Sequence, residues 1–505
     1  MVSMYTKTVK GAFTIEILIA FTVVTLALSG AVMVALGGQV SGMDMNLSGG
    51  GLHREMSLYE RNVAQAYSSW AGLTSVAASD PNDDLGYSTS TTVAYVSPCI
   101  KEVSSSVSWS SDKSRTLGAA VTMLAGSVAE ARALGGGCDP LPPLSGWENP
   151  DSFGSIDVSG ADGTGVVARS VAGHRYVFLT ADPSAAAKED LYIFNVDDAQ
   201  SPSLTGSLNT GKGLNDIVVA GQYAYVVQND NVDQLQVVDI STPSAPVVVA
   251  TASLPGVVST GSYPEGRSIA YSNNRLYIGT NETAGPEFHI FDVTTPTAPA
   301  SLGSLEVTHN VHDIAVRSST AYLATSADYG ELVLIDVSTP ASLSLPPNFS
   351  TPDTMDKKFN ARTHTGTPTE STENGTTLDV VGTRVYLGRE RASNANERDL
   401  YIIDVSTQSA LTELGSLRIG IGSNTEVSGI ISQGTYAFVM STDSNSPFQV
   451  IDTTDPSAMF VQSSCGFNFS QVTRAISYLD NFIFSANRSN DILRIIYDKP
   501  GTSCS

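Results

Sequence analysis

Five polar residues of the chain each stand just before an apolar, strand-like run: Arg169, Asn215, Arg267, His312 and Arg474. If these strands surround one axis, the five side chains form a ring at one end of it. Guanidinium groups grip anions as planar forks, and amide or imidazole groups add neutral hydrogen bonds. The set therefore predicts a site for an anionic or polyhydroxyl ligand, such as a surface glycan. The alternative is that the arginines pair with Asp216, Asp313 and Asp379 and only hold neighbouring elements together.

Other residue patterns argue against catalysis. The sequence has no nucleophile-elbow, zinc-protease, P-loop or dinucleotide-binding motif. His309 and His312 form an H-x-x-H pair, but no acidic or cysteine partner stands at ligand spacing. The loop 229–233 is rich in Asp and Asn but lacks the glycine and the distal glutamate of an EF-type calcium loop. We therefore expect no enzyme activity, no metal and no cofactor.

A single carboxylate, Glu16, interrupts an apolar run from Ala12 to Leu36. As a helix, this run is long enough to cross a bilayer. A charge inside it costs about 2.5–3.5 kcal/mol, and pairing with an opposite charge offsets that cost. Lys7 and Lys10 precede the run, as expected for a cytoplasmic N-terminus. We therefore expect a single-pass span whose acid is neutralised by another subunit.

The stretch Gly11-Ala12-Phe13-Thr14-Ile15-Glu16 resembles the cleavage signal of type IV prepilins and pseudopilins. The resemblance implies that a prepilin peptidase cuts after Gly11 and methylates Ala12. It also implies that Glu16 neutralises the N-terminal amine of a neighbouring subunit during assembly. Ala12 departs from the usual phenylalanine of the family, and Phe13 follows it. Two alternatives are a secretory signal peptide, with a poor cleavage site near residue 37, and a plain membrane anchor.

The resemblance divides the first part of the chain into a leader at 1–11, a pilin helix at 12–75 that spans the membrane over 12–36, and a small pilin-like α+β region at 76–134. The glycines at 49–51 predict a break in the helix, because each costs about 1 kcal/mol. After the break, an apolar face is predicted at Leu52, Met56, Tyr59, Val63, Ala66 and Trp70, with Arg54, Glu55 and Arg61 elsewhere around the axis.

The α+β region shows one clear strand. Val103, Val107 and Trp109 alternate with serines, which is typical of a half-buried strand. Residues 116–134 fit either a returning strand or a helix, and we expect the strand of a hairpin. The glycine- and proline-rich residues 135–154 are expected to be a linker.

A repeat follows the linker. Its anchor is a strand ending in Asp, then a turn and usually Pro, as in Val237-Val238-Asp239-Ile240-Ser241-Thr242-Pro243. The clear copies lie at 237–243, 290–296, 334–340 and 402–407, and weaker ones at Asp197, Asp452 and Asp498. Most of these seven anchors are 42–53 residues apart, and an apolar strand and an aromatic strand precede each. We interpret the aspartates as turn caps, because Asp oxygens accept turn N–H groups and Pro ends the strand.

This period, with several short strands per unit, is typical of β-propeller blades. The motif resembles the LVIVD repeat over about 165–498. We therefore expect a mainly β protein whose residues 155–505 form a seven-bladed propeller, with six or eight blades as alternatives. Residues 154–159 are expected to supply the outer strand that the last unit lacks, so that both termini close the ring and no sheet edge is exposed.

Composition bears on compartment and partners. The 505 residues include 27 Lys and Arg against 50 Asp and Glu, a net charge of −23, which argues against a direct nucleic-acid partner. No C-x-x-C occurs, and in an exported chain we expect the disulfides Cys99–Cys138 and Cys465–Cys504. The polar insertion 343–375, with Lys357, Lys358, Arg362 and His364, is either a recognition loop or a disordered excursion, and its composition favours disorder.

These patterns lead to one functional hypothesis. We expect a minor type IV pilin or pseudopilin that displays a propeller at the cell surface or pilus tip for adhesion or ligand binding. Its partners would be the prepilin peptidase and other pilin subunits, first in the cytoplasmic membrane and then in an extracellular filament. Two alternatives remain open: a membrane-tethered propeller hydrolase or lyase, and a pseudopilin of a secretion or DNA-uptake machine.

Overall fold

The structure of the protein is a computed structural model. It describes residues 42–68, 73, 75–79, 87–97, 100–112, 115–126, 147–158, 160–171, 174–183, 188–228, 232–257, 266–346, 356–361, 373–391, 398–423, 425–462, 467–488 and 491–499. The chain divides into two compact units, which are described separately. The leader 1–11, the predicted span 12–36 and the residues up to 41 lie outside the described part. From Gly42 onward, no described helix is both long and apolar enough to cross a membrane.

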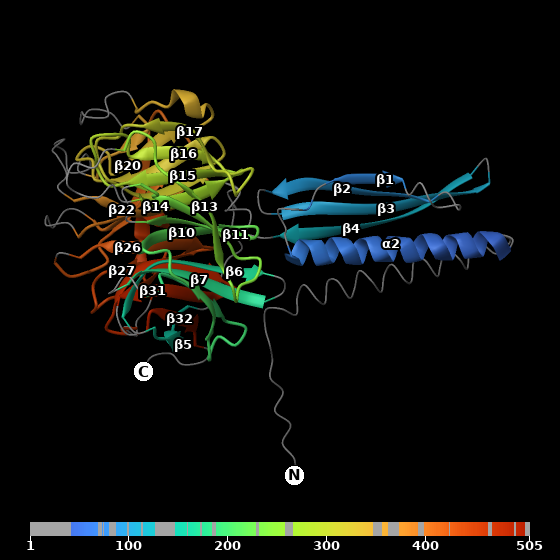
Figure 1. Ribbon diagram of the computed structural model, residues 1–505, viewed down its shortest axis with the longest axis horizontal. Helices are drawn as coiled ribbons and strands as arrows, with labels where there is room; N and C mark the ends of the chain where they lie inside the picture. Colours follow the sequence, from blue (N-terminus) through green and yellow to red (C-terminus); the bar gives the residue numbers. More distant parts are fainter. Residues whose placement is uncertain are drawn as a thin grey trace, which may run out of the picture. The chain divides into compact units, whose positions relative to one another are not determined.

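The first unit is one helix and a four-stranded sheet (Figure 1). Helix α2 spans Gly42–Ser68. The strands are β1 (Val76–Ser79), β2 (Ser88–Ser97), β3 (Ile100–Asp112) and β4 (Arg115–Gly126), in the order β1-β2-β3-β4. The strand interpretation of residues 116–126 is therefore correct, and the helical alternative is wrong for them.

Helix α2 packs on the sheet through a face with an apolar and a polar part. Leu58 contacts a cluster that includes Tyr87 and Val107. One turn further on, Asn62 Nδ2 donates hydrogen bonds to Ser105 Oγ (2.8 Å) and Thr91 Oγ1 (3.2 Å). The serine-rich strand β3 thus requires a polar partner on the helix as well as an apolar one, because buried hydroxyls need hydrogen bonds.

Two expectations for this helix are wrong. Helix α2 continues through the glycines at 49–51 and ends at Ser68 rather than at 75. Tertiary packing therefore overrides the low helix propensity of glycine. The buried face is also rotated from the predicted one: Leu52 and Met56 are 44% and 43% exposed, whereas Glu55 is buried and its pKa is raised to about 7 by desolvation. The apolar pattern misplaced the face because the serines of β3 bury polar helix residues.

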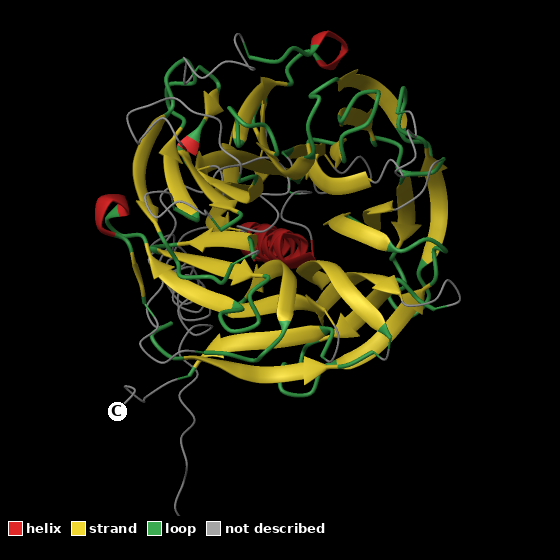
Figure 2. Ribbon diagram, turned by 90° about the vertical axis from the view of Figure 1, so that its left-hand side faces the viewer, coloured by secondary structure: helices red, strands yellow, loops and turns green. Residues whose placement is uncertain are grey.

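The second unit contains seven four-stranded sheets. Sheet 1 is β6–β9, sheet 2 is β10–β13, sheet 3 is β14–β17, sheet 4 is β18–β21, sheet 5 is β22–β25, sheet 6 is β26–β29, and sheet 7 is β30, β31, β32 and β5. The first strand of each sheet contacts the first strands of its two neighbours, and β30 contacts β6, so the seven inner strands form a closed ring. Figure 2 shows these sheets around one axis, the arrangement of a β-propeller.

The inner strands, numbered from sheet 1 to sheet 7, are β6 (Ala161–Val171), β10 (Leu214–Ala220), β14 (Gly266–Ser272), β18 (Val311–Arg317), β22 (Gly375–Val381), β26 (Val427–Gln433) and β30 (Val472–Leu479). The second strands are β7 (His174–Pro183), β11 (Tyr223–Gln228), β15 (Arg275–Thr280), β19 (Thr320–Thr325), β23 (Arg384–Arg389), β27 (Tyr436–Ser441) and β31 (Phe482–Arg488). The third strands are β8 (Leu191–Asn195), β12 (Leu235–Asp239), β16 (Phe288–Asp292), β20 (Leu332–Asp336), β24 (Leu400–Asp404), β28 (Phe448–Asp452) and β32 (Leu493–Asp498). The outer strands are β9 (Ser203–Leu208), β13 (Val247–Ala252), β17 (Ala300–Leu305), β21 (Lys358–Phe359), β25 (Thr412–Leu417), β29 (Phe460–Val461) and β5 (Pro150–Ile156).

Strand β5 closes the ring as the sequence predicts. It pairs antiparallel with β32 and becomes the outer strand of sheet 7, which joins the two ends of the propeller chain. The strand begins inside the range 135–154 that was expected to be a linker, so that expectation is wrong for its last residues. Trp147, just before β5, is fully buried: its Nε1 donates to Asn481 Oδ1 (2.9 Å), and its ring lies edge-on to Phe438 at 4.6 Å.

The repeated aspartates at the ends of the third strands cap turns. Asp239 Oδ1 accepts the backbone N–H of Ser241 (2.8 Å), and the same bond recurs in four further sheets, at Asp292, Asp336, Asp404 and Asp452. Hydrogen bonds from the side chain and backbone of Ser241 lower the pKa of Asp239. The prediction of a structural role is confirmed for these five aspartates. Asp197 differs, because it accepts from the backbone of Arg175 instead.

A second repeated acid was not anticipated from the sequence. It stands just before the third strand, is buried, and accepts backbone N–H groups of the segment that leads to the next sheet. Asp190 Oδ1 accepts from Thr210 (2.7 Å), Glu287 Oε2 from Val307 (2.8 Å), and Asp399 Oδ2 from Ile419 (3.2 Å). These acids satisfy loop donors that the sheet ladders leave unpaired.

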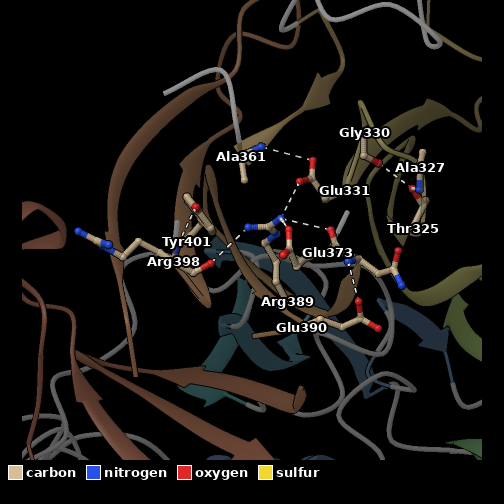
Figure 3. A network of polar contacts seen from close by, with 11 residues as sticks. Thr325, Ala327, Gly330, Glu331, Ala361, Glu373, Arg389, Glu390, Arg398 and Tyr401 are labelled. Atoms are coloured by element: carbon tan, nitrogen blue, oxygen red, sulfur yellow. Dashed lines mark hydrogen bonds and ion pairs between the residues drawn. The ribbon is translucent and has the colours of Figure 1, made fainter. Parts of the chain in front are cut away.

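Sheet 4 has an enlarged version of this acid site (Figure 3). Glu331 Oε1 lies 3.0 Å from Nη2 of the fully buried Arg389, which also lies 4.0 Å from Glu373 Oε2. Arg389 Nη1 donates to the Arg398 carbonyl (3.3 Å), and Glu331 Oε2 accepts from Ala361 N (3.3 Å). The cluster therefore joins sheet 4 to sheet 5 through buried charge.

The insertion 343–375 is partly ordered, contrary to expectation. Lys358 and Phe359 form β21, pair with β20 and are buried. Hydrophobic burial of Phe359 in the cluster between sheets 4 and 5 outweighs the polar composition around it. Arg362 and His364 lie outside the described residues.

Replacing Trp147 with Ala is expected to lower the free energy of unfolding of the propeller by about 3–5 kcal/mol, because it removes a fully buried aromatic ring and orphans Asn481. The matched control is Phe460→Ala, since the Phe460 side chain is 53% exposed. Urea unfolding followed by tryptophan-independent circular dichroism checks both. Equal midpoints for the two variants would contradict the role of Trp147 as a clasp.

Candidate ligand site at the mouth of the propeller channel

The first turn of every inner strand contains a β-bulge. The pairing register with the second strand shifts across one residue in each of the seven sheets. A bulge re-aims the side chain of the extra residue. The seven extra residues, which we call the mouth ring, are Thr164, Asn215, Arg267, His312, Thr376, Ser428 and Arg474.

All seven residues of the mouth ring line one cavity of about 210 Å³. Four of the five residues predicted from the sequence therefore lie together: Asn215, Arg267, His312 and Arg474. The structure separates the fifth, Arg169, from them. It lies five residues beyond Thr164 along β6, about 17 Å at 3.3–3.4 Å per residue, and its Nη1 donates to the Val219 carbonyl (2.9 Å). The sequence analysis misplaced Arg169 because a bulge position cannot be read from hydrophobicity.

The sequence analysis missed Thr164, Thr376 and Ser428. Short hydroxyl residues at the start of an apolar strand do not stand out by composition. The available signal was positional, since each occupies the same place in its repeat as Arg267 or His312. Alignment of the seven inner strands on their second residue would have found all three.

The neutral members of the mouth ring bind the next sheet. Thr164 Oγ1 donates to the Leu214 carbonyl (2.6 Å), Asn215 Nδ2 to the Gly266 carbonyl (2.7 Å), and Thr376 Oγ1 to the Val427 carbonyl (2.6 Å). In each case the acceptor is the first residue of the neighbouring inner strand. These three side chains therefore have a structural role at the sheet junctions.

Three aspartates make a second set of junction contacts. Asp216 Oδ2 accepts from Ile269 N (3.0 Å), Asp313 Oδ2 from Leu378 N (2.8 Å), and Asp379 Oδ2 from Ser432 N (2.7 Å). Burial raises the pKa of Asp216 to about 7. The alternative in which arginines pair with these aspartates to hold sheets together has a different basis here, since the aspartates reach the next sheet through its backbone N–H groups.

The basic members of the ring face the cavity. Arg267 Nη1 donates to Asn281 Oδ1 (2.9 Å). Arg474 is exposed and makes no hydrogen bond or ion pair with any described residue. The Nε2 atom of His312 is buried without a hydrogen-bond partner among the described residues, and desolvation, aided by Arg267, lowers its pKa to about 3. His312 is therefore a neutral imidazole at physiological pH.

Two glutamates complete the electrostatics of the mouth, and the sequence analysis missed both. Glu426 stands one residue before β26, and burial raises its pKa, whereas the charges of Arg267 and Arg474 oppose that rise. Both guanidinium groups thus lie within electrostatic range of one carboxyl. The backbone of Glu426 forms an antiparallel bridge with Glu390, whose charge also raises the Glu426 pKa. The mouth therefore carries both signs of charge.

The remaining predicted site residues lie outside the described part of the chain. They are the processing and assembly residues Gly11, Ala12, Phe13 and Glu16, and the four cysteines Cys99, Cys138, Cys465 and Cys504. The peptidase signal and both disulfides accordingly stay predictions from the sequence.

Comparison with known proteins identifies the repeat. The sequence model of the LVIVD repeat matches residues 214–252, 310–351 and 395–418, which include three of the four clear Asp-turn copies. No curated protein matches the chain. Among solved structures, the crystal structure of BamB from Moraxella catarrhalis is similar over 73% of this chain and 97% of that chain, at 12% identity and a TM-score of 0.40. A likeness this weak carries no argument, and the assignment of a β-propeller with LVIVD repeats rests on the sheets and the repeat match.

Replacing Asp379 with Ala is expected to destabilise the propeller by about 2–4 kcal/mol, because Ser432 N and Oγ both lose a buried acceptor. Asp239→Ala is the control: it removes an exposed turn cap, which is worth about 1 kcal/mol. Urea midpoints of the full chain measure both. A loss at Asp379 no larger than that at Asp239 would contradict the junction role.

Proposed function

We propose that this protein is a minor type IV pilin or pseudopilin that displays a seven-bladed LVIVD-like propeller at the cell surface or pilus tip for adhesion or ligand binding. One structural observation supports the proposal most: α2 and its four-stranded antiparallel sheet directly follow the prepilin-like signal at 11–16. A helix backed by such a sheet suits a pilin subunit, since the helix can enter a filament while the sheet covers its outer end.

The size of the propeller favours sparse incorporation. A unit of seven sheets is too bulky to be packed at every position of a tight filament shaft, so a tip position or occasional insertion suits it better. The partners in this proposal are the prepilin peptidase, other pilin subunits and a surface ligand. The net charge of −23 disfavours a direct grip on nucleic acid.

The proposal predicts two separable defects. Gly11→Val should block processing, leaving a product longer by the leader on an immunoblot, because the peptidase requires the residue before the cut. Glu16→Gln should leave processing intact but lower the amount in sheared filaments about tenfold or more, since an unpaired N-terminal amine is costly in an apolar setting.

Glu148→Gln is the matched control for the loss of one carboxylate, since Glu148 is exposed in the second unit. Mass spectrometry of the N-terminus and immunoblots of sheared filaments provide the readouts. Normal processing and normal filament content in both Gly11→Val and Glu16→Gln would refute the pilin assignment.

A second function, a tethered hydrolase or lyase, is favoured by Glu390 and Glu426. Paired carboxylates are the machinery of glycosidic bond cleavage, and these two residues share a backbone bridge at the channel mouth. Incubation of the full chain with acidic polysaccharides and analysis of reducing ends decides between the two. Product formation that disappears in Glu426→Gln would support the enzyme, and the absence of product from wild type would leave the adhesive reading.

A further inference from the structure

We propose that the mouth ring binds the carboxylate of a terminal acidic sugar, a hexuronic or sialic acid, between Arg267 and Arg474. This inference rests on the proposed function, because a displayed adhesive domain requires a ligand outside the cell. It adds the chemical class of that ligand and the side chains that select it.

The division of labour within the ring identifies the binding groups. Thr164, Asn215 and Thr376 are committed to carbonyl groups of the next sheet. Arg474 has no hydrogen bond or ion pair within the described residues, and the buried Nε2 of His312 has no partner there. A buried imidazole nitrogen without a partner is costly unless a ligand supplies one. The two residues therefore point to an occupant of the cavity.

The charge at the mouth favours a ligand with a single negative charge. Arg267 and Arg474 attract an anion, whereas Glu426 and Glu390 stand among them and oppose it. Below the ring, the buried Asp216 and Asp313 line the same cavity. A phosphate dianion would meet repulsion from these carboxyls. A carboxylate has half that charge, and its planar geometry fits guanidinium forks.

The walls of the cavity favour a sugar as the carrier of that carboxylate. At about 210 Å³, the cavity is smaller than the about 300–1,000 Å³ of most small-molecule sites, so it suits a single terminal ring. The mouth ring has no apolar or aromatic member. Thr164 and Thr376 donate their protons to carbonyl groups, so their oxygens remain able to accept hydrogen bonds from sugar hydroxyls.

Isothermal titration calorimetry of the full chain in mild detergent tests the proposal. The probes are galacturonic acid, N-acetylneuraminic acid, galactose, galactose 6-sulfate and N-acetylglycine. An acidic sugar should bind at least about tenfold tighter than galactose, which lacks the carboxylate, and than N-acetylglycine, which lacks the hydroxyls; tenfold corresponds to about 1.4 kcal/mol.

Three variants locate the site. Arg474→Ala should weaken binding about tenfold or more, and Arg474→Lys should restore only part of it, because lysine keeps the charge but not the fork. The exposed position of Arg474 makes a folding defect improbable, and a thermal melt verifies this. Arg169→Ala is the matched control, since it removes an arginine of the same inner ring of strands away from the mouth, and it should leave affinity unchanged.

Several results would overturn the proposal: no binding of either acidic sugar, undiminished affinity in Arg474→Ala, or tighter binding of galactose 6-sulfate or N-acetylglycine than of the acidic sugars. Filament incorporation is scored separately on the same preparations. Loss of sugar binding from a chain that still enters filaments would refute this inference alone, whereas exclusion from filaments with sugar binding intact would refute the pilin proposal alone.

Discussion

The antiparallel pairing of β5 with β32 is the contact on which the second unit depends. Each sheet buries its faces against two neighbours, so an open ring would leave two sheets half covered and expose a strand edge. The pairing Arg494↔Ser155 and its neighbours remove that edge by joining residues more than 300 positions apart. Trp147 reinforces the join from a buried position against Phe438. Only a closed ring brings seven equivalent bulges to one cavity.

The repeat places its variation where it does not disturb this closure. Turn aspartates, buried acids before the third strands and outer-strand glycines recur from sheet to sheet. Gly206, Gly303, Gly415 and Gly154 each lie against a turn carbonyl of the following sheet, where a Cβ would come within 1.7–2.2 Å of the oxygen. The bulge position tolerates different residues, since its side chain faces the channel. Recognition groups can therefore change there without loss of the fold.

The sequence predicted the fold more fully than the site. Seven Asp-turn anchors give the number of sheets, and the missing last strand gives the closure by residues near 154, because both follow from local patterns of strand and turn. The bulges follow from strand pairing between sheets, so Thr164, Thr376 and Ser428 escaped notice and Arg169 was misplaced. Glu426 was missed because its relation to Arg267 and Arg474 exists only across the ring. In the first unit, Glu55 and Asn62 were not foreseen as buried because a serine-rich strand accepts polar partners.

Charge explains how one mouth can be selective in an acidic protein. The acids that stabilise the sheets use backbone N–H groups, which leaves the guanidinium of Arg474 without a protein partner among the described residues. Glu426 beside the arginines limits the negative charge that can enter. Binding and architecture thus rely on different residues within the same seven strands, and each can be altered without the other.

Ring closure is tested most directly by amide hydrogen exchange of the full chain in Gly154→Ala, with Ser155→Ala as the control. The added methyl group would lie 2.2 Å from the Ala199 carbonyl oxygen, so β5 cannot keep its place. If closure holds the ring, protection falls in β32 and also in the inner strands β6, β26 and β30 on both sides of the join. Loss of protection confined to β5 and β32, with those inner strands unchanged, would contradict the account.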